Sequence, residues 1–423
     1  MKVCFVPRCA PVTPVSVTSA EEPGPRQPTI HRRSVAGNNR RVTLTLCLVV
    51  LFAWSGWGAL TPAAAQDDPP CRPGVRWLFR PADMCAEDLL TEFGAQGIAS
   101  VGALDFGPDG ALYFASPAQR AIMRMAPDGE GYYGAPEIFA GELPEAPIGL
   151  SYDAESAAWY ASGDTMLWRL REGVAPEVLV SGLPGGAGGW LGNVRVGPDR
   201  RLYVTKGASC EDCAETDPLR ATLLSFTLDG GDMRVEAAGL RDAFDFAWNP
   251  ADGSLVIVEG ERPSLPAELN VLRADRSAAP DFGWPFCDAN GAPVAGIPGV
   301  DALRCAETIR PALALDPESG PMGLLFYDGA AFPQYQGGLL LALGGSWNAT
   351  SIAGYELRLV RFDGSGSATS ERILPFSGRT TSDASLIRSS FYPYHLTGLA
   401  LDERGWIYAG VAEGRIYRFR PLP

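Results

Sequence analysis

The sequence predicts an all-β protein, a six-bladed β-propeller, and two observations support this prediction. First, an apolar run, a turn centred on Asp or Gly, and a second apolar or aromatic strand follow one another six times along the 423-residue chain. A strand, a turn of this kind and a second strand form a β-hairpin. Hairpins that recur at a spacing of roughly 40–50 residues are typical of propeller blades. Second, helical periodicity is almost absent, which favours an all-β fold.

The six hairpins divide the chain into similar units. Their first residues are Val101, Ile148, Gly192, Ala243, Met322 and Thr397. Strands in which apolar and polar residues alternate follow at 121–129, 165–170, 221–230, 355–364 and 415–419. Such alternation suits a strand that packs one face on the next blade. One short helix is expected at 81–93, before the first blade.

The spacing of the turns predicts two insertions within a single domain that spans residues 66–423. Aspartates occupy the turns at positions 109, 153, 199, 252, 328 and 402. The first three intervals are 44, 46 and 53 residues, whereas the last two are 76 and 74 residues. The later blades therefore carry insertions, at about 262–312 and 365–393. Long insertions on a regular scaffold are places where loops shape a binding site.

The first 65 residues have the composition of an export signal. Residues 1–41 contain seven Lys or Arg and two Glu, residues 42–60 are apolar, and the run Ala63–Ala65 follows. This order predicts a basic n-region and a signal peptide that is cleaved after Ala65. The apolar run could instead serve as a short membrane anchor, but the alanine triplet favours cleavage. We therefore expect a periplasmic or secreted protein without stable membrane insertion.

The mature region is acidic. The whole chain carries a net charge of −14, and removing residues 1–65 removes seven positive and two negative charges, which leaves about −19. Nucleic acids and anionic membranes are bound through basic surfaces. The composition therefore argues against nucleic acid as a partner. It fits an exported protein that is kept dispersed by its charge.

Six cysteines remain after the presequence, and they lie in neighbouring pairs. In an oxidising compartment the simplest pairing is Cys71–Cys85, Cys210–Cys213 and Cys287–Cys305. Cys210 and Cys213 have the spacing of a redox motif, but no alternation of strands and helices surrounds them, which favours a structural disulfide. One such pair without further ligands cannot build a zinc site.

The repeat brings residues that are distant in sequence to one place. The innermost strands of a propeller line a central channel, and the ends at which the chain enters these strands meet at one mouth. The positions just before the inner strands are Gly149, Trp190–Asn193, Arg241–Asp242, Glu318–Gly323 and His395–Thr397. Small ligands bind in concave sites with a few converging polar groups, so this mouth is the predicted site. The fold alone does not identify a reaction.

Four runs of the sequence resemble the glucose/sorbosone dehydrogenase family. They are Gly239–Asp242 with Trp248–Pro250, Val258–Pro263 with Glu268–Asn270, Asp281–Cys287, and Gly345–Asn348. The similarity covers about residues 101–419. Members of this family are exported six-bladed propellers that use pyrroloquinoline quinone (PQQ) and calcium. The resemblance therefore implies this fold, these cofactors and the oxidation of a sugar.

The family's chemistry implies a base, usually a histidine, that takes a hydroxyl proton while hydride passes to the quinone. His395 is the one histidine of the mature region. Residues 188–193 correspond to the segment that carries the base in the family's glucose enzymes, and this segment contains no histidine. Gly344 stands where the sorbosone type often has one, and Glu318 stands at another frequent histidine position. His395 and Glu318 are therefore the candidate catalytic residues.

Both candidates also have a plainer interpretation. His395 could be a structural histidine held by hydrogen bonds. Glu318 could be a solvated loop carboxylate, because it would act as a base near neutral pH only if burial raised its pKa.

The resemblance also nominates residues for the quinone. The family's Arg-Asn pair corresponds to Arg241 and Asp242, and a carboxylate beside an anionic cofactor is unfavourable unless a cation intervenes. The further candidates for cofactor binding are Lys206, Trp190, Asn193 and Trp347. Arg241 could instead pair with Asp242 or Asp245. The tryptophans, including Trp284, could simply pack between blades.

Calcium is expected on the segment from Glu259 to Glu268, which matches the family well. Its ligands would be backbone oxygens of Gly260 and Pro263 and the carboxylate of Glu268, because calcium prefers oxygen ligands. A plain turn is the alternative interpretation of this segment.

Together these features predict an exported PQQ-dependent dehydrogenase that oxidises a sugar or polyol and passes electrons to an acceptor. The alternative is a catalytically inactive propeller that binds a ligand or a protein partner at the channel mouth, because the family's histidine is missing. A third possibility is a calcium-dependent hydrolase of the lactonase kind. It would need a ring of carboxylates and amides, for which Asn193, Asp242, Asp105 and Asp245 are available.

Overall fold

The computed structural model describes residues 69–72, 83–91, 98–186, 191–211, 213–260, 265–275, 278–299, 302–345, 353–364, 366–375 and 395–422. The chain divides into two compact units, Met1–Ala65 and Gln66–Pro423, and all described residues belong to the second. The predicted signal region 1–65 therefore lies outside the described residues.

Six antiparallel four-stranded sheets make up the described fold. The first two contain β2 (Leu104–Phe106), β3 (Leu112–Ser116), β4 (Ala121–Met125) and β5 (Glu137–Ala140), then β6 (Gly149–Asp153), β7 (Ala158–Ser162), β8 (Leu167–Arg171) and β9 (Val174–Val180). The next two contain β10 (Leu191–Val196), β11 (Arg201–Lys206), β12 (Thr222–Thr227) and β13 (Arg234–Ala238), then β14 (Asp242–Trp248), β15 (Leu255–Gly260), β16 (Ala267–Leu272) and β17 (Leu313–Leu315). The last two contain β18 (Pro321–Phe326), β19 (Leu339–Leu343), β20 (Glu356–Phe362) and β21 (Ala368–Pro375), then β22 (Leu396–Leu401), β23 (Ile407–Val411), β24 (Arg415–Pro421) and β1 (Met84–Asp88).

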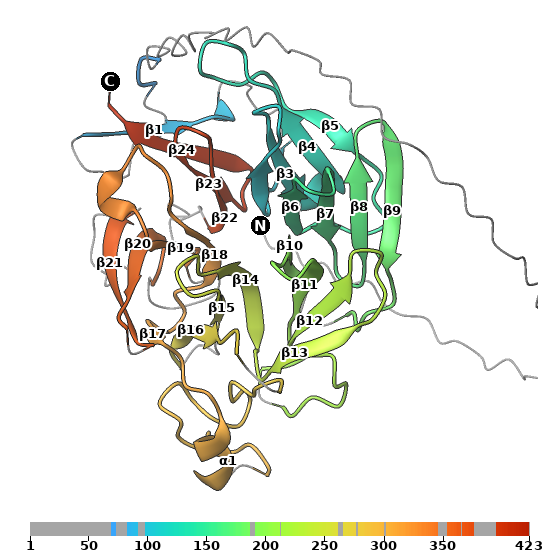
Figure 1. Ribbon diagram of the computed structural model, residues 1–423, viewed down its shortest axis with the longest axis vertical. Coiled ribbons are helices and arrows are strands. Elements are labelled where there is room, and N and C mark those ends of the chain that lie inside the picture. The colour runs from blue at the N-terminus through green and yellow to red at the C-terminus, as the bar shows by residue number, and fades with distance from the viewer. Residues whose placement is uncertain are drawn as a thin grey trace, which may run out of the picture. The chain divides into compact units, whose positions relative to one another are not determined.

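The sheets stand around a central axis as the blades of a propeller (Figure 1). The first strand of each hairpin is innermost, and it contacts the innermost strands of both neighbouring sheets, so that β2, β6, β10, β14, β18 and β22 form a closed ring. The second strand of a blade is the most deeply buried, since every residue of β3, β7, β11, β19 and β23 is buried. The six-bladed propeller expected from the sequence is confirmed.

The turns of the hairpins use the Asp and Gly residues that the repeat contains. In the turn between β2 and β3, Asp109 Oδ1 accepts a hydrogen bond from the Ala111 amide at 3.2 Å, and Gly110 has a φ of 71°. In the turn between β22 and β23, Asp402 Oδ1 accepts one from the Trp406 amide at 2.8 Å, and Gly405 has a φ of 79°. Glycine adopts this left-handed backbone without a steric penalty.

A strand from the N-terminal part of the chain closes the ring. β1 pairs with β24 in antiparallel register, so the last sheet has the order β1-β24-β23-β22. The expectation of a short helix at 81–93 is therefore wrong. All five residues of β1 are buried, and pairing with a strand at the other end of the chain outweighs a local helical pattern.

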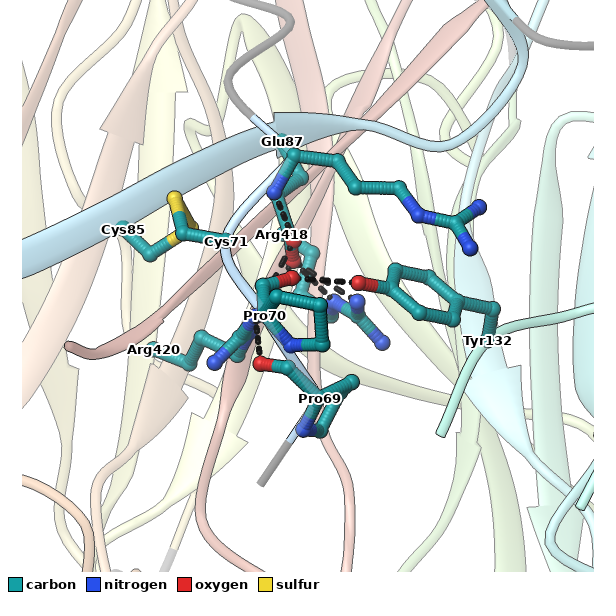
Figure 2. The surroundings of a disulfide bond; sticks show 9 residues. Pro69, Pro70, Cys71, Cys85, Glu87, Tyr132, Arg418 and Arg420 are labelled. Atoms are coloured by element: carbon teal, nitrogen blue, oxygen red, sulfur yellow. Dashed lines mark hydrogen bonds and ion pairs between the residues drawn. A yellow bond between two sulfur atoms is a disulfide. The ribbon is translucent and has the colours of Figure 1, made fainter. Parts of the chain in front are cut away.

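A buried ion cluster holds this closing strand (Figure 2). Glu87 of β1 accepts hydrogen bonds from Arg418 Nε at 2.7 Å and from Arg420 Nε at 3.1 Å. Both arginines have an exposed fraction of 0%. Burial alone would raise the pKa of Glu87, but the hydrogen bond from Arg420 and the charge of Arg418 outweigh it, so this pKa is lowered. The cluster ties the first and last strands of the propeller together.

Two blade strands lie inside the ranges that the spacing assigns to insertions. β16 occupies part of 262–312, so the insertion in this blade is the connection between β16 and β17, which contains the helix α1 (Ala302–Glu307). β21 occupies the first part of 365–393, and residues 376–394 lie outside the described residues. Each range therefore contains a blade strand in addition to the connection, because the spacing of the turns identifies a long blade but not where its extra residues lie.

The three expected disulfides are present. They join Cys71 to Cys85, Cys210 to Cys213 and Cys287 to Cys305, with Cα–Cα distances of 5.8, 5.9 and 5.5 Å. The first fastens the segment before β1 to the closing strand, and the third lies in the connection between β16 and β17. Among the described residues, no helix has the length and apolar character needed to span a membrane.

Candidate functional site

All six blades contribute to a cavity of about 350 Å³ at one end of the central channel. We call this end the first mouth. It is lined at the starts of the inner strands by Gly102, Ala103, Ile148, Asn193, Phe244, Asp245, Met322, Thr397 and Gly398. Loops between the second and third strands of three blades add Pro117, Asp164 and Ala412. Of the positions that the repeat predicts to converge, Asn193, Met322 and Thr397 line this cavity. Arg241, Asp242, Glu318 and His395 are not among its lining residues.

A glycine recurs at the same place in five of the six units, and the geometry of the first mouth explains it. A Cβ atom on Gly149 would lie 2.8 Å from the Cα of Asn193, and one on Gly192 would lie 2.6 Å from the Phe244 carbonyl oxygen. A Cβ on Gly398 would lie 3.0 Å from the Cα of Ala103. Neighbouring inner strands therefore approach backbone to backbone where they begin.

His395 lies at the entrance to β22, two residues before the cavity-lining Thr397. Its Nδ1 atom contacts a carboxylate oxygen of Glu413, and its backbone amide donates to the other oxygen of Glu413 at 2.9 Å. Its Nε2 atom lies 3.4 Å from the Tyr355 hydroxyl. An ionised carboxylate only accepts, so Glu413 fixes the Nδ1–H tautomer and leaves the lone pair of Nε2 directed toward Tyr355.

Arg241 and Asp242 lie together at the start of β14. Arg241 Nη1 is 3.3 Å from Asp242 Oδ2 and donates to the Gly260 carbonyl oxygen, also at 3.3 Å. The Nε atom of Arg241 is buried and has no hydrogen-bond partner among the described residues. Burial raises the pKa of Asp242, and the charge of Arg241 offsets this only in part. This segment therefore offers an unused donor beside a carboxyl group whose pKa lies above its usual value.

A pair of buried carboxylates lies on the same blade. Glu259 and Glu268 face each other across β15 and β16, and Asn270 Nδ2 donates to both, at 2.6 and 3.1 Å. Burial raises the pKa of Glu268 to about 7, and the hydrogen bonds from Asn270 and Glu259 lower it only partly. Two adjacent carboxylates need a shared proton or a cation. The buried Oδ1 of Asn270 has no partner in the described chain.

Lys206 and Asn193 are already engaged within the protein. Lys206 is fully buried, and its Nζ donates to the backbone and side-chain oxygens of Asp164 at 3.0 and 3.2 Å. Asn193 Oδ1 accepts from the Leu150 amide, and its Nδ2 donates to Asp245, at 2.9 and 3.0 Å. Asn193 therefore braces neighbouring strands, and Lys206 reaches the cavity only through Asp164.

Glu318 lies just before β18 in the left-handed region, with a φ of 61°. Its Oε2 atom is buried and has no partner within the described residues, and the same holds for the hydroxyl of Ser319 and for Nε1 of Trp284. Unpaired buried polar atoms are costly unless a ligand or water satisfies them. Trp190, Trp347 and Pro263 lie outside the described residues.

The sequence did not identify the residues that hold the candidate base. Glu413 follows β23 and Tyr355 precedes β20, and neither has a spacing to His395 that indicates contact. The same is true of Asp164, which receives Lys206. A signal exists only for Glu259, because it lies directly beside Gly260 in the segment already nominated for calcium.

Comparison with known proteins confirms the family resemblance over part of the chain. A model of the glucose/sorbosone dehydrogenase family matches residues 226–379, and a model of the strictosidine synthase-like N-terminal family matches residues 398–419. A curated relative, an uncharacterized protein of Borreliella burgdorferi, is 26% identical over 149 residues, or 34% of this chain. The matched part spans 38% of that relative's length.

Solved structures of similar fold cover most of this chain. The PQQ domain of a Coprinopsis cinerea pyranose dehydrogenase in its holo form has a TM-score of 0.67 at 15% identity and covers 83% of this chain and 100% of its own. A calcium structure of a Trichoderma reesei enzyme of carbohydrate-active family AA12 has a TM-score of 0.65 at 16% identity, and the match covers 83% of this chain and 98% of that one. A PQQ-bound aldose sugar dehydrogenase from Streptomyces coelicolor has a TM-score of 0.56 at 18% identity, and the match covers 81% of this chain and 99% of that one. At these identities the likeness demonstrates the propeller fold.

Proposed function

We propose that this protein is an exported dehydrogenase that oxidises a sugar or polyol, with PQQ and calcium at the first mouth of the channel. The family match over 226–379 and the fold support a sugar dehydrogenase-like function. The observation that carries the proposal is the arrangement of His395, whose ring is held by Glu413 and which lies two residues before Thr397 of the cavity lining. Three disulfides support an oxidising compartment outside the cytoplasm.

His395 is the proposed general base. A substrate hydroxyl would take the place of the Tyr355 hydroxyl at Nε2 and transfer its proton there. Glu413 would stabilise the resulting imidazolium and keep the ring in its orientation, as a carboxylate does for a catalytic histidine. Tyr355 would then donate to the substrate oxygen. Oε2 of Glu318 is buried without a hydrogen-bond partner among the described residues, and we propose it as a second acceptor for the substrate's hydroxyl groups.

The residues of the fourth blade fit the two implied cofactors. Arg241, with its unused buried Nε, would hold a carboxylate of PQQ, and Asp242 could do so when protonated, because its pKa is raised by burial. Glu268, the Gly260 carbonyl and the Asn270 amide oxygen would hold calcium, which would replace the proton shared by Glu259 and Glu268. When bound, PQQ supplies the acceptor for the hydride that leaves the substrate carbon.

Reconstitution tests the proposal. The purified mature protein is incubated with PQQ and calcium, and dye reduction is followed over a panel of aldoses and polyols. We expect substrate-dependent turnover, and His395→Ala should lower kcat by about 10²- to 10⁴-fold, the usual contribution of a positioned base. Glu413→Gln should lower it by a smaller factor, because the ring remains but loses its orientation. The exposed Arg273→Ala serves as control. The absence of any PQQ-dependent turnover would refute the proposal.

The alternative is a propeller that binds a ligand at the same mouth without turning it over. The internal bonds of Lys206 and Asn193 favour it, because these side chains do not present free groups to a cofactor. Reconstitution distinguishes the two: a binding protein would shift its melting temperature with PQQ or a sugar but reduce no dye.

A further inference from the structure

A second cavity lies at the opposite end of the same channel. It has a volume of about 680 Å³ and is lined by residues further along five of the inner strands, and we call it the second mouth. In β10, for example, Asn193 lines the first mouth and Arg195 the second, and in β14 the corresponding residues are Asp245 and Trp248. None of the residues proposed to hold a cofactor lines this second cavity.

The floor of the second mouth offers polar groups with spare hydrogen-bonding capacity. Arg195 donates to Asp245 through Nε at 3.1 Å and Nη2 at 3.0 Å, and within the described chain its Nη1 makes no hydrogen bond. Ser151 lines the same cavity, and its buried hydroxyl has no partner among the described residues. An unsatisfied buried hydroxyl is expected where a ligand or water completes the network.

The walls of the second mouth are aromatic and held in fixed orientations. The ring of Trp248 packs edge-on against Tyr203 and Phe246, with centroids 5.2 and 5.7 Å apart. The ring of Tyr152 packs against Trp159 at 5.1 Å. Trp248 and Tyr152 are half-buried and line the cavity, so part of each ring is exposed to it. Rigid aromatic faces beside hydrogen-bonding groups suit the C–H faces and hydroxyls of a sugar.

Most charges of this mouth compensate one another, whereas the exposed Asp328 also lines it and makes no ion pair within the described residues. Arg195 is paired with Asp245, and Asp153 is paired with Arg200 at 2.7 Å. Asp105 is surrounded by the amides of Phe106 and Tyr152, and burial raises its pKa, so it ionises less readily than an exposed aspartate. Apart from Asp328, a site of this composition offers little net attraction to a charged ligand.

We propose that the second mouth binds a neutral monosaccharide or cyclic polyol, with its ring against Trp248 and Tyr152 and its hydroxyls on Arg195 and Ser151. This site is separate from the proposed catalytic mouth and does not depend on PQQ. The aromatic faces provide apolar contact, and the two polar groups fix the orientation of the ring.

Calorimetric titration without added PQQ tests this proposal. The mature protein is titrated with D-glucose, D-xylose and myo-inositol, and with D-glucosamine and D-gluconate as charged counterparts. We expect a neutral ligand to bind, Trp248→Ala to weaken it about tenfold, since an aromatic contact contributes up to about 1.5 kcal/mol, and His395→Ala to leave it unchanged. Ser151→Ala removes a hydroxyl without a protein partner, so it should fold normally and weaken binding by a smaller factor.

Three results would overturn the proposal. One is that no neutral ligand binds. Another is that binding is lost in His395→Ala and kept in Trp248→Ala, which would place the ligand at the first mouth. The third is that D-glucosamine or D-gluconate binds more tightly than D-glucose. None of these results bears on turnover with PQQ, so failure here is distinguishable from failure of the proposed function.

Discussion

The two mouths of the channel are built from the same inner strands but by different means. At the first mouth, glycines such as Gly192 and Gly398 bring neighbouring backbones together, and polar side chains come both from the strand starts, such as Asn193, and from a loop, such as Asp164. At the second mouth the strands carry most of the lining side chains themselves, among them Arg195 and Trp248. The first mouth therefore depends on close backbone packing as well as on its polar side chains. The second depends on the side chains that the strands present.

The largest expected effect is a loss of stability of the whole propeller, which carries both mouths. Glu87→Gln leaves two fully buried arginines, Arg418 and Arg420, without their carboxylate. Breaking a buried ion pair by removing one partner costs about 3–5 kcal/mol. We expect the free energy of unfolding, measured in guanidinium chloride, to fall by this amount. Glu403→Gln, on the exposed turn before β23, is the matched control. An unchanged free energy would mean that this cluster does not hold the closing strand.

A somewhat smaller loss is expected from the disulfide beside this cluster. Replacing both Cys71 and Cys85 with serine should lower the free energy of unfolding by about 2–4 kcal/mol, because the cross-link restricts the unfolded chain. Replacing Cys210 and Cys213 should cost less, because the loop they close spans only three positions. If the two pairs contributed equally, the closing strand would not have the special role assigned to it.

The backbone contacts of the first mouth are tested by adding one methyl group. Gly192→Ala would place Cβ 2.6 Å from the Phe244 carbonyl oxygen, and overpacking of this kind costs about 1–3 kcal/mol. Gly364→Ala is the control, because no atom lies within 4 Å of the added Cβ. We expect Gly192→Ala to lower the melting temperature and Gly364→Ala to leave it nearly unchanged. Equal melting temperatures would contradict the close approach of the inner strands.

The closing cluster also predicts a dependence on acid. The pKa of Glu87 is lowered in the folded protein, so its contribution to stability is present above its unfolded value of about 4.5 and is lost as the pH falls through the folded value. Thermal unfolding between pH 7 and pH 3 should show this loss in the wild type and a shallower slope in Glu87→Gln. Parallel slopes would contradict a charged Glu87.

The smallest effect concerns the second mouth. The pKa of Asp105 is raised by burial, opposed by the Tyr152 amide and the charge of Arg195 and supported by the charge of Asp245. The free energy of unfolding therefore falls as the pH rises from about 3.8, the pKa of Asp105 in the unfolded chain, to its higher pKa in the folded protein. Asp105→Asn does not ionise, so its stability relative to the wild type should improve as the pH rises. A difference that does not change with pH would show that Asp105 ionises as freely as when unfolded.

The fold was largely predictable because its determinants are local. Turns such as Asp109-Gly110 and the alternation within strands specify hairpins over a dozen residues, and the repeat specifies the blades. β1 was misassigned because its conformation depends on β24, which lies at the other end of the sequence. The pattern of residues 81–93 does not indicate that this segment pairs with a distant strand.

The candidate site was predictable only as a set of converging positions. His395 could be nominated because no other histidine exists in the mature region. Its partners Glu413 and Tyr355 could not, because they come from other loops and their contacts are set by tertiary packing. Likewise, the sequence does not reveal that Lys206 is taken up by Asp164, or that Glu259 and Glu268 share one amide donor.

The central claim, that the first mouth holds PQQ, is tested most directly by titrating the protein with PQQ in the presence of calcium. We expect saturable binding that Arg241→Ala weakens strongly, because its unused Nε is the proposed anchor, and that Trp248→Ala leaves unchanged. No binding by the wild type, or binding that Arg241→Ala does not affect, would contradict the account.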